Sequence, residues 1–229
     1  MNNTSARGGV FCVIPAYNEA ETIVKIIQEA KDLVDEVVVV DDGSTDQTSS
    51  RLLNSGAVVL KHIINRGQGA ALRTGTEYSL NRGADIIAHF DADGQFLSSD
   101  ILKIIEPIKQ GEAEVVFGSR FLGSQAGLNM PFFKKRAIMP LARAVNKLFF
   151  KIDLTDPQSG FRAMSRAAAA KVHWRQDRMA HCSEIMFNVK RNNFKMAEVP
   201  IKIIYNRFGQ SFFDGLEIVK DLFIALLVN

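Results

Sequence analysis

The 229-residue chain has few cysteines and lacks any long hydrophobic run. The separation of its two cysteines, Cys12 and Cys182, does not fit a metal-binding motif, so we expect two reduced thiols in a cytosolic protein. No run of about 18 apolar residues is present, which predicts that the chain does not span a membrane. Residues 1–9 also lack the apolar core of a signal peptide. These absences predict a cytoplasmic protein.

Acidic residues are missing from a long central segment. Between residues 115 and 152 there is no Asp or Glu, although the net charge of the whole chain is only +3. That total is too small to indicate nucleic-acid binding, and we expect no nucleic-acid partner. The segment contains these basic residues: Arg120, Lys134, Lys135, Arg136, Arg143, Lys147 and Lys151. With its phenylalanines, a helix over about 131–150 would suit an anionic membrane surface; packing of the phenylalanines in the core is the alternative.

Strand and helix patterns alternate through the first half of the chain. Strands are predicted at 10–14, 36–40, 57–60, 86–90 and 114–118, and helices at 19–33, 45–54, 69–80 and 98–109. Strict alternation predicts an α/β fold with a mostly parallel sheet flanked by helices. Beyond residue 120 we predict the amphipathic helix, a polar turn at 156–162, a helix at 182–191, a strand at 198–205 and a closing helix at 213–228.

Polar clusters follow three of the predicted strands directly. They comprise residues 15–19, 41–44 and 91–95. In sheets of this type, ligands bind beyond the carboxyl ends of the strands. We therefore expect the three clusters to converge on one edge of the sheet and to form a ligand site there.

The third cluster contains two carboxylates. Asp91 and Asp93 follow the buried strand at 86–90, and two residues apart on an extended chain they would point to the same side. Gln95 adds a side-chain amide oxygen. Three oxygen ligands suit a hard divalent cation, Mg²⁺ or Mn²⁺, which in this position would neutralise a diphosphate. The alternative is a helix cap.

The first two clusters could bind a nucleoside. Asp42 or Asp41 can accept a hydrogen bond from a base N–H or a ribose hydroxyl, Tyr17 can stack on a base, and Glu19 can hold a ribose. The alternative for the aspartates is a turn that caps the next helix.

A glycine-rich loop at 65–71 opens the third predicted helix. Such loops let backbone N–H groups approach phosphate, and close packing of the loop on the sheet is an equal alternative. No Gly-Lys-Ser/Thr follows, so this is not a Walker loop, and a dinucleotide fingerprint would follow the first strand. Arg120 follows the fifth strand, where it could face a diphosphate or an acceptor phosphate. The four histidines do not form a ligand set, and His89 is expected to pack in the interior.

In order along the chain, these motifs resemble the family-2 glycosyltransferases of GT-A (Rossmann-like) fold, and among them the dolichyl-phosphate mannose synthases and bacterial polyprenyl-phosphate glycosyltransferases. The resemblance covers roughly residues 10–215. The motifs are Pro15-Ala16-Tyr17-Asn18-Glu19, Asp41-Asp42-Gly43-Ser44-Thr45-Asp46, Asp91-Ala92-Asp93-Gly94-Gln95, Gly118-Ser119-Arg120 and Ser159-Gly160-Phe161-Arg162. Arg207 matches a later Arg-x-x-Gly-x-Ser-Lys segment, in which this chain has Phe212 instead of the lysine.

The resemblance implies roles for individual residues. Nucleotide binding would involve Pro15, Tyr17, Asn18, Glu19, Asp41, Asp42, Gly69, Asp91 and Ala92. The metal, Mg²⁺ or Mn²⁺, would be held by Asp91, Asp93 and Gln95. Catalytic roles would fall to Asp93, Arg120 and Arg207. The acceptor would be bound by Arg120, Arg136, Ser159, Arg162, Arg207 and Ser211.

The resemblance further implies an inverting, metal-dependent transfer of mannose or glucose from a GDP- or UDP-sugar to a polyprenyl phosphate. One domain would span 1–229, with the donor in 8–120 and the acceptor in 121–229. The enzyme would be peripheral at the cytoplasmic face of the cell membrane, and its apolar helix at 213–228 could support a homo-oligomer.

Other activities stay open at this point. A sugar hydroxyl acceptor in a cell-envelope glycan would need a general base, for which Glu184 and Asp156 are the candidates. A sugar-phosphate nucleotidyltransferase would want a glycine-rich basic loop after the first strand, where this chain has residues 15–19. A receiver-like signalling domain would be much shorter.

Overall fold

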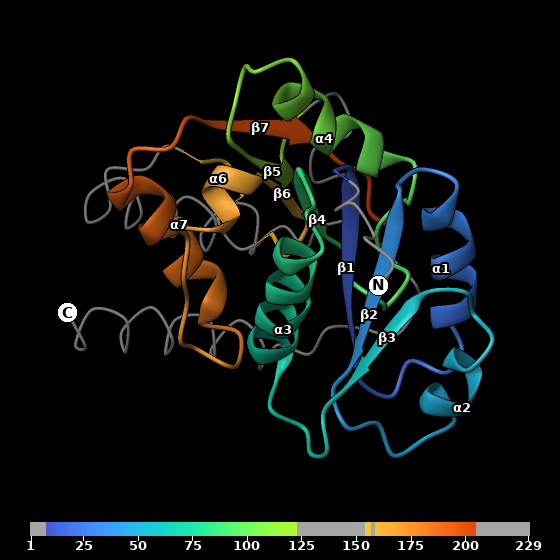
Figure 1. The fold of residues 1–229 in the computed structure, drawn as a ribbon. Helices are drawn as coiled ribbons and strands as arrows, with labels where there is room; N and C mark the ends of the chain where they lie inside the picture. Colours follow the sequence, from blue (N-terminus) through green and yellow to red (C-terminus); the bar gives the residue numbers. More distant parts are fainter. Residues whose placement is uncertain (1–7, 123–153, 157–158, 205–229) are drawn as a thin grey trace, which may run out of the picture.

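The structure, a computed structural model, describes residues 8–122, 154–156 and 159–204. Its described strands form one seven-stranded sheet in the order β3-β2-β1-β4-β6-β5-β7 (Figure 1). The strands are β1 (Val10–Ala16), β2 (Glu36–Asp41), β3 (Val58–Lys61), β4 (Ile86–His89), β5 (Val115–Ser119), β6 (Arg162–Ser165) and β7 (Met196–Pro200). The helices are α1 (Ile23–Lys31), α2 (Thr48–Leu52), α3 (Gln68–Asn81), α4 (Asp100–Lys109), α6 (Arg166–Ala169) and α7 (His181–Arg191).

The sheet is mostly parallel, as the alternating pattern predicts. β1 pairs in parallel with β2 and β4, β2 with β3, and β5 with β7. β6 is the exception, because it lies antiparallel between β4 and β5. We predicted a polar turn over residues 156–162, but Arg162 is not part of a turn, because it is the first residue of the buried strand β6. A four-residue strand that starts with a charged residue lacks the apolar run by which the other strands can be identified.

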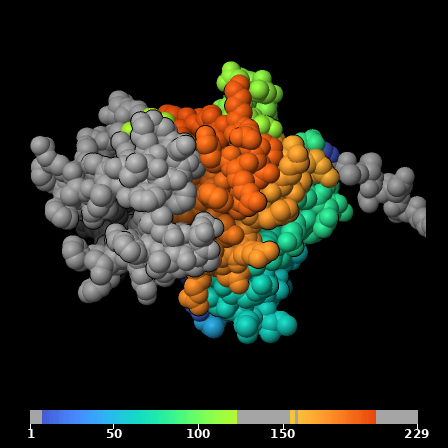
Figure 2. All heavy atoms as spheres, turned by 90° about the vertical axis from the view of Figure 1, so that its left-hand side faces the viewer, coloured from blue at the N-terminus to red at the C-terminus, as the bar shows by residue number. Residues whose placement is uncertain are grey.

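Helices cover both faces of the sheet. Alternate residues of β1 point to opposite faces: Cys12 and Ile14 pack in one apolar cluster with α1, α2 and α4, whereas Phe11 and Val13 pack in the other with α3, α6 and α7. Figure 1 shows α1 and α2 on one side of the strands and α3 on the other. In Figure 2, which faces the second side, residues of α6, α7 and β7 (orange) form much of the described surface.

Some predicted boundaries were wrong by a few residues. Helix α2 starts at Thr48 with Gln47 as its N-cap, whereas the sequence predicted a start at residue 45. The last described strand covers Met196–Pro200 instead of the predicted 198–205. Asp46 Oδ1 accepts a hydrogen bond from Thr48 N at 2.8 Å, which ties the preceding turn to the start of α2. Within the described residues, no helix has the length and apolar character needed to cross a membrane. The predicted helices at 131–150 and 213–228 lie outside the described residues, and the single-domain organisation stays a prediction.

Candidate active site

The polar clusters that follow β1, β2 and β4 converge at the carboxyl edge of the sheet. The first two clusters are linked directly, since Thr45 N donates to Asn18 Oδ1 at 2.8 Å and Asn18 N to Ser44 Oγ at 3.1 Å. The first and third are linked by Thr22 Oγ1, which donates to Ala92 O at 2.6 Å. Parallel pairing brings the ends of these strands together, and the hydrogen bonds then fix their loops as one unit.

Asp91 and Asp93 lie in the turn after β4. Burial raises the pKa of Asp91 to about 7, and the neighbouring charge of Asp93 adds to this effect. Burial likewise raises the pKa of Asp93, whose Oδ1 accepts from Gln95 N at 2.9 Å. Since burial disfavours the charged form of both carboxyl groups, a bound cation would stabilise them in the ionised form.

The backbone of Gly160 lies close against the carboxylate of Asp91. A Cβ atom on Gly160 would lie 2.8 Å from Asp91 Oδ2 and 3.2 Å from Oδ1. Any larger residue at 160 would therefore push against the carboxylate. No third His, Cys, Asp or Glu in the described chain completes a ligand set with the two aspartates. Two carboxylates fit Mg²⁺ or Mn²⁺, which commonly retains water and substrate phosphate as its other ligands.

The residues predicted to bind a nucleoside differ in how accessible they are. Tyr17 is 45% exposed, and its ring is available for stacking on a base. Glu19 accepts from Thr22 Oγ1 at 3.1 Å, and burial, with a smaller effect from Asp93, raises its pKa. Pro15 is the penultimate residue of β1 and lies beside Val40 of β2.

Asp41 and Asp42 are buried and hold the surrounding loops. Asp42 is 2% exposed, and its carboxylate accepts from Gly67 N at 2.6 Å and from Arg66 N at 3.0 Å. Asp41 accepts from Ser44 N at 2.9 Å and also from the hydroxyl of Ser49. Burial alone would raise the pKa of Asp41, but these hydrogen bonds outweigh it and lower the pKa. In this structure both aspartates anchor the surrounding loops, and their predicted role in nucleoside binding stays a prediction.

His62 is a further anchor that sequence reasoning missed. Its Nδ1 lies 2.6 Å from Asp42 Oδ1, and its Nε2 lies 2.9 Å from Thr74 Oγ1 on α3. A chain of hydrogen bonds therefore connects β2, the loop after β3 and the helix. The sequence contains no local signal for this role, because the three residues are separated by 12 to 32 positions.

Packing explains the glycines of the 65–71 loop. A Cβ atom on Gly67 or Gly69 would collide with the carbonyl oxygens of Asp177 and Gln176, respectively. Residues 174–178 thus lie directly against the start of α3. Of the two alternatives for this loop, the described contacts support close packing, here on residues 174–178 rather than on the sheet. The predicted role of Gly69 in nucleotide binding stays a prediction.

Arg120 is held by a buried carboxylate. Its Nε and Nη2 donate to Asp156 Oδ2 at 2.5 Å and to Oδ1 at 2.7 Å, and the Asp156 side chain is completely buried. Glu198 on β7 supports this arrangement by accepting from the backbone N of Thr155 at 2.8 Å and of Asp156 at 3.0 Å. Glu198 is another residue that the sequence did not reveal.

Ser159 and Arg162, predicted to bind the acceptor, lie in the interior. They are 2% and 1% exposed. Arg162 donates to Gly160 O at 3.3 Å, and its Nη2 lies 3.2 Å from His181 Nε2 and 3.4 Å from Cys182 Sγ. Burial alone would raise the pKa of the Cys182 thiol, but His181 and Arg162 lower it to about 6.

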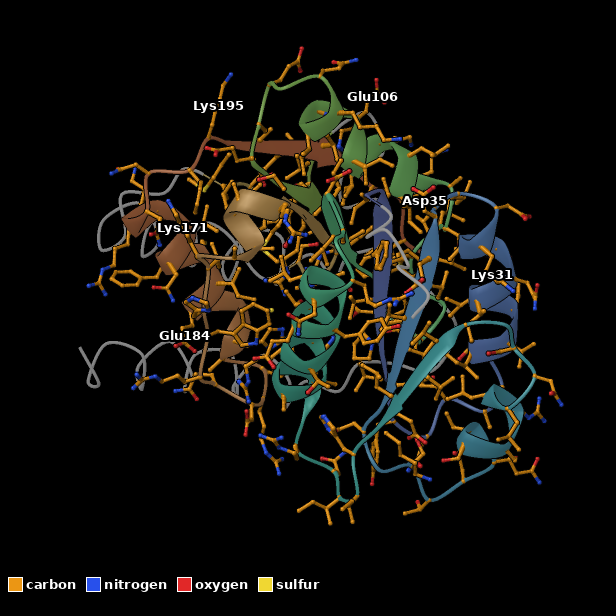
Figure 3. The ribbon with its side chains drawn as sticks, in the orientation of Figure 1. Lys31, Asp35, Glu106, Lys171, Glu184 and Lys195 are labelled. Carbon is orange, nitrogen blue, oxygen red and sulfur yellow. The ribbon has the colours of Figure 1, made fainter. Side chains whose placement is uncertain are left out.

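Glu184, a candidate general base, has a structural role in the described contacts. Figure 3 shows it on α7, and its Oε2 accepts from Arg175 N at 2.8 Å and from Gln176 N at 2.9 Å. Predicted site residues Arg136, Arg207 and Ser211 lie outside the described residues.

Comparisons with known proteins agree with this geometry. Residues 11–173 match the family model described as Glycosyl transferase family 2. The chain is 33% identical to UDP-N-acetylglucosamine–dolichyl-phosphate N-acetylglucosaminyltransferase of Methanococcus voltae, with 96% of this chain and 95% of that protein covered. It is 27% identical to polyprenol monophosphomannose synthase of Mycolicibacterium smegmatis, with 92% and 83% covered.

A solved structure shares the fold. The crystal structure of glucosyl-3-phosphoglycerate synthase from Mycobacterium tuberculosis, in complex with Mn²⁺, uridine diphosphate and glucosyl-3-phosphoglycerate, matches with a TM-score of 0.70. The match has 21% sequence identity and covers 93% of this chain and 78% of that one. The fold prediction is therefore confirmed, and the chain is a GT-A-fold enzyme that belongs to glycosyltransferase family 2.

Proposed function

We propose that this enzyme transfers a hexose or N-acetylhexosamine from a nucleoside-diphosphate sugar to a polyprenyl phosphate, with inversion at the anomeric carbon. The observation that carries the proposal is the position of two partly buried carboxylates, Asp91 and Asp93, in the turn after β4 at the carboxyl edge of the sheet. The names of the two relatives, which specify dolichyl phosphate and polyprenol, support a lipid-phosphate acceptor. The sugars in those names differ, so the donor has to be determined by experiment.

Asp91 and Asp93 would hold a divalent cation, whose charge stabilises the nucleoside diphosphate as it leaves. Tyr17, exposed at the same edge, would stack on the base. A larger residue in place of Gly160 would press on the Asp91 carboxylate and disturb this arrangement. Arg120 would pair with the acceptor phosphate, and its bond to Asp156 would orient its guanidinium group before the acceptor arrives.

The nucleophile in this proposal is a phosphate oxygen. The second pKa of a phosphomonoester is about 6, so near neutral pH this oxygen is already largely ionised and needs no protein base. A sugar hydroxyl would need a base within hydrogen-bonding distance. The two candidates for that role are engaged elsewhere, since Glu184 binds the backbone of 175–176 and Asp156 binds Arg120. This supports a phosphate acceptor over a glycan hydroxyl.

A lipid acceptor would require the enzyme to work at a membrane surface. We propose a peripheral position at the cytoplasmic face, because the basic residues between 120 and 152, a stretch without Asp or Glu, would attract anionic lipid.

The test is a transfer assay with purified protein and a polyprenyl phosphate. UDP-N-acetylglucosamine, UDP-glucose and GDP-mannose are offered separately with Mn²⁺ or Mg²⁺, and the lipid-linked sugar is measured by mass spectrometry. We expect product from one donor, none with EDTA, and none from a polyprenol without the phosphate. Transfer should fall by about a hundredfold in Asp93→Ala. Transfer that survives both EDTA and Asp93→Ala would disprove the metal-dependent mechanism, and product formed on a polyprenol without the phosphate would favour a hydroxyl acceptor.

A further inference from the structure

Gln68, the first residue of α3, contacts one of the two aspartates directly. Its Nε2 donates to Asp91 Oδ1 at 2.7 Å, although the two residues are 23 positions apart. The side-chain amide is neutral, so it fixes one oxygen of the carboxylate without cancelling its negative charge. The other oxygen, Oδ2, is the one nearest to Gly160.

The backbone on both sides of Gln68 is fixed by residues 174–178. Gly67 has φ of 108°, a conformation that favours glycine, and its Cα lies against the carbonyl of Asp177. On the other side, Gly69 O accepts from Trp174 Nε1 at 2.8 Å, and Ala70 N donates to Asp177 O at 3.2 Å. These contacts fix the backbone on both sides of Gln68, from which its side chain reaches Asp91.

Residues 174–178 are themselves held at several points. Arg73 Nη1 donates to Trp174 O at 3.1 Å, and its Nη2 pairs with Asp177 Oδ1 at 2.5 Å. Glu184 binds the backbone between these points, as described above. Figure 1 shows this loop, which leads into α7, beside the start of α3 at the carboxyl edge of the sheet. The packing of α7 is thereby connected through the loop to Gln68.

We propose that Gln68 is a positioning residue that orients Asp91 toward the divalent cation and diphosphate of the donor, and that residues 174–178 hold Gln68 in place for this role. The proposal rests on the proposed function, because it assigns the metal to Asp91. An amide suits this role, since a carboxylate with its charge intact and only one oxygen engaged can still bind a cation strongly.

The first test is Gln68→Met, which keeps the length of the side chain and removes the donor. Binding of Mn²⁺ is measured by electron paramagnetic resonance, without acceptor, in the presence of saturating UDP and in parallel with GDP. Loss of an outer partner of a metal ligand typically weakens metal binding by 10–100-fold, so we expect an affinity loss of about tenfold. The thermal midpoint of the metal-free protein should not change. Gln110→Met is the matched control, because Gln110 is exposed and contacts Glu106 instead.

The second test is a double-mutant cycle with Trp174→Phe, which keeps an aromatic ring and removes the Nε1 donor to Gly69 O. If Trp174 acts through Gln68, the single change weakens Mn²⁺ binding and adds little when Gln68→Met is already present. Additive effects of the two substitutions would contradict the part assigned to residues 174–178.

Asp91→Asn separates this inference from the proposed function. Normal Mn²⁺ binding by Gln68→Met together with lost binding by Asp91→Asn would overturn the role of Gln68 and leave the proposed function standing. Normal binding by both variants would overturn the metal site itself.

Discussion

The buried ion pair between Arg120 and Asp156 predicts a large loss of stability when its charge is removed. Asp156→Asn keeps the size of the side chain, but it removes the negative charge and places an NH2 group against the guanidinium group. Two side-chain hydrogen bonds join the pair, from Nε at 2.5 Å and from Nη2 at 2.7 Å, and the backbone N of Arg120 also donates to Asp156 Oδ2 at 3.1 Å. Hydrogen bonds to charged groups contribute about 1.5–3 kcal/mol each, and one of them can form with the oxygen of asparagine.

Burial of the two side chains decides how much the ion pair contributes to the free energy of unfolding. Breaking a fully buried pair costs about 3–5 kcal/mol. The Asp156 side chain is 0% exposed but that of Arg120 is 26% exposed, so water can partly solvate the arginine once it is released. We therefore expect Asp156→Asn to lower the free energy of unfolding by about 2–4 kcal/mol, as measured by urea denaturation at pH 7.

The chain contains a matched control. Arg73 and Asp177 form a pair with the same 2.5 Å separation and the same 26% exposure of the arginine, but the Asp177 side chain is 40% exposed. Exposed pairs contribute at most about 1 kcal/mol, so Asp177→Asn should have a small effect. Equal losses in the two variants would refute the argument from burial. Under the proposed function, Asp156→Asn should also reduce transfer to the lipid phosphate in the fraction that stays folded.

Three further predictions concern glycines and a buried thiol. Gly160→Ala should abolish stabilisation of the protein by Mn²⁺ with UDP in a thermal-shift assay, because the added Cβ would lie 2.8 Å from Asp91 Oδ2; an undiminished shift would contradict this. Gly75→Ala should lower the free energy of unfolding in urea, since the clash of its Cβ with Val13 costs about 1–3 kcal/mol against a helix-propensity gain of about 1 kcal/mol. Recovery of stability in the double variant with Val13→Ala would support the clash, and a more stable single variant would disprove it. Burial raises the pKa of the Cys12 thiol from 9.0 to about 12. Between pH 9 and pH 12 the thiol therefore ionises only in the unfolded protein, so its contribution to the free energy of unfolding is complete below pH 9 and decreases as the pH rises toward 12. Between pH 8 and pH 10 the wild type should lose roughly 1 kcal/mol more than Cys12→Ala in urea denaturation, and identical pH slopes would show that the thiol makes no such contribution.

Local patterns in the sequence were sufficient for the fold class and for the convergence of the polar clusters on one edge of the sheet. Continuous apolar runs such as 36–40 identify strands buried on both faces, and helical spacing between them requires a parallel sheet. Because parallel strands end at one edge, the clusters at residues 17, 42 and 91 could be placed together before the structure was known. The family resemblance was likewise carried by short motifs, each of which is continuous in the chain.

The partners of the site residues were decided only by the tertiary structure. Gln68 meets Asp91, Asp156 meets Arg120, and Glu198 supports Asp156 across separations of 23, 36 and 42 residues. Asp156 lies on the segment that precedes β6, and no periodicity in the sequence signals that β6 inserts between β4 and β5. A strand's own residues determine that it is buried, but its neighbours depend on how the whole chain closes, because many pairings satisfy the same local pattern.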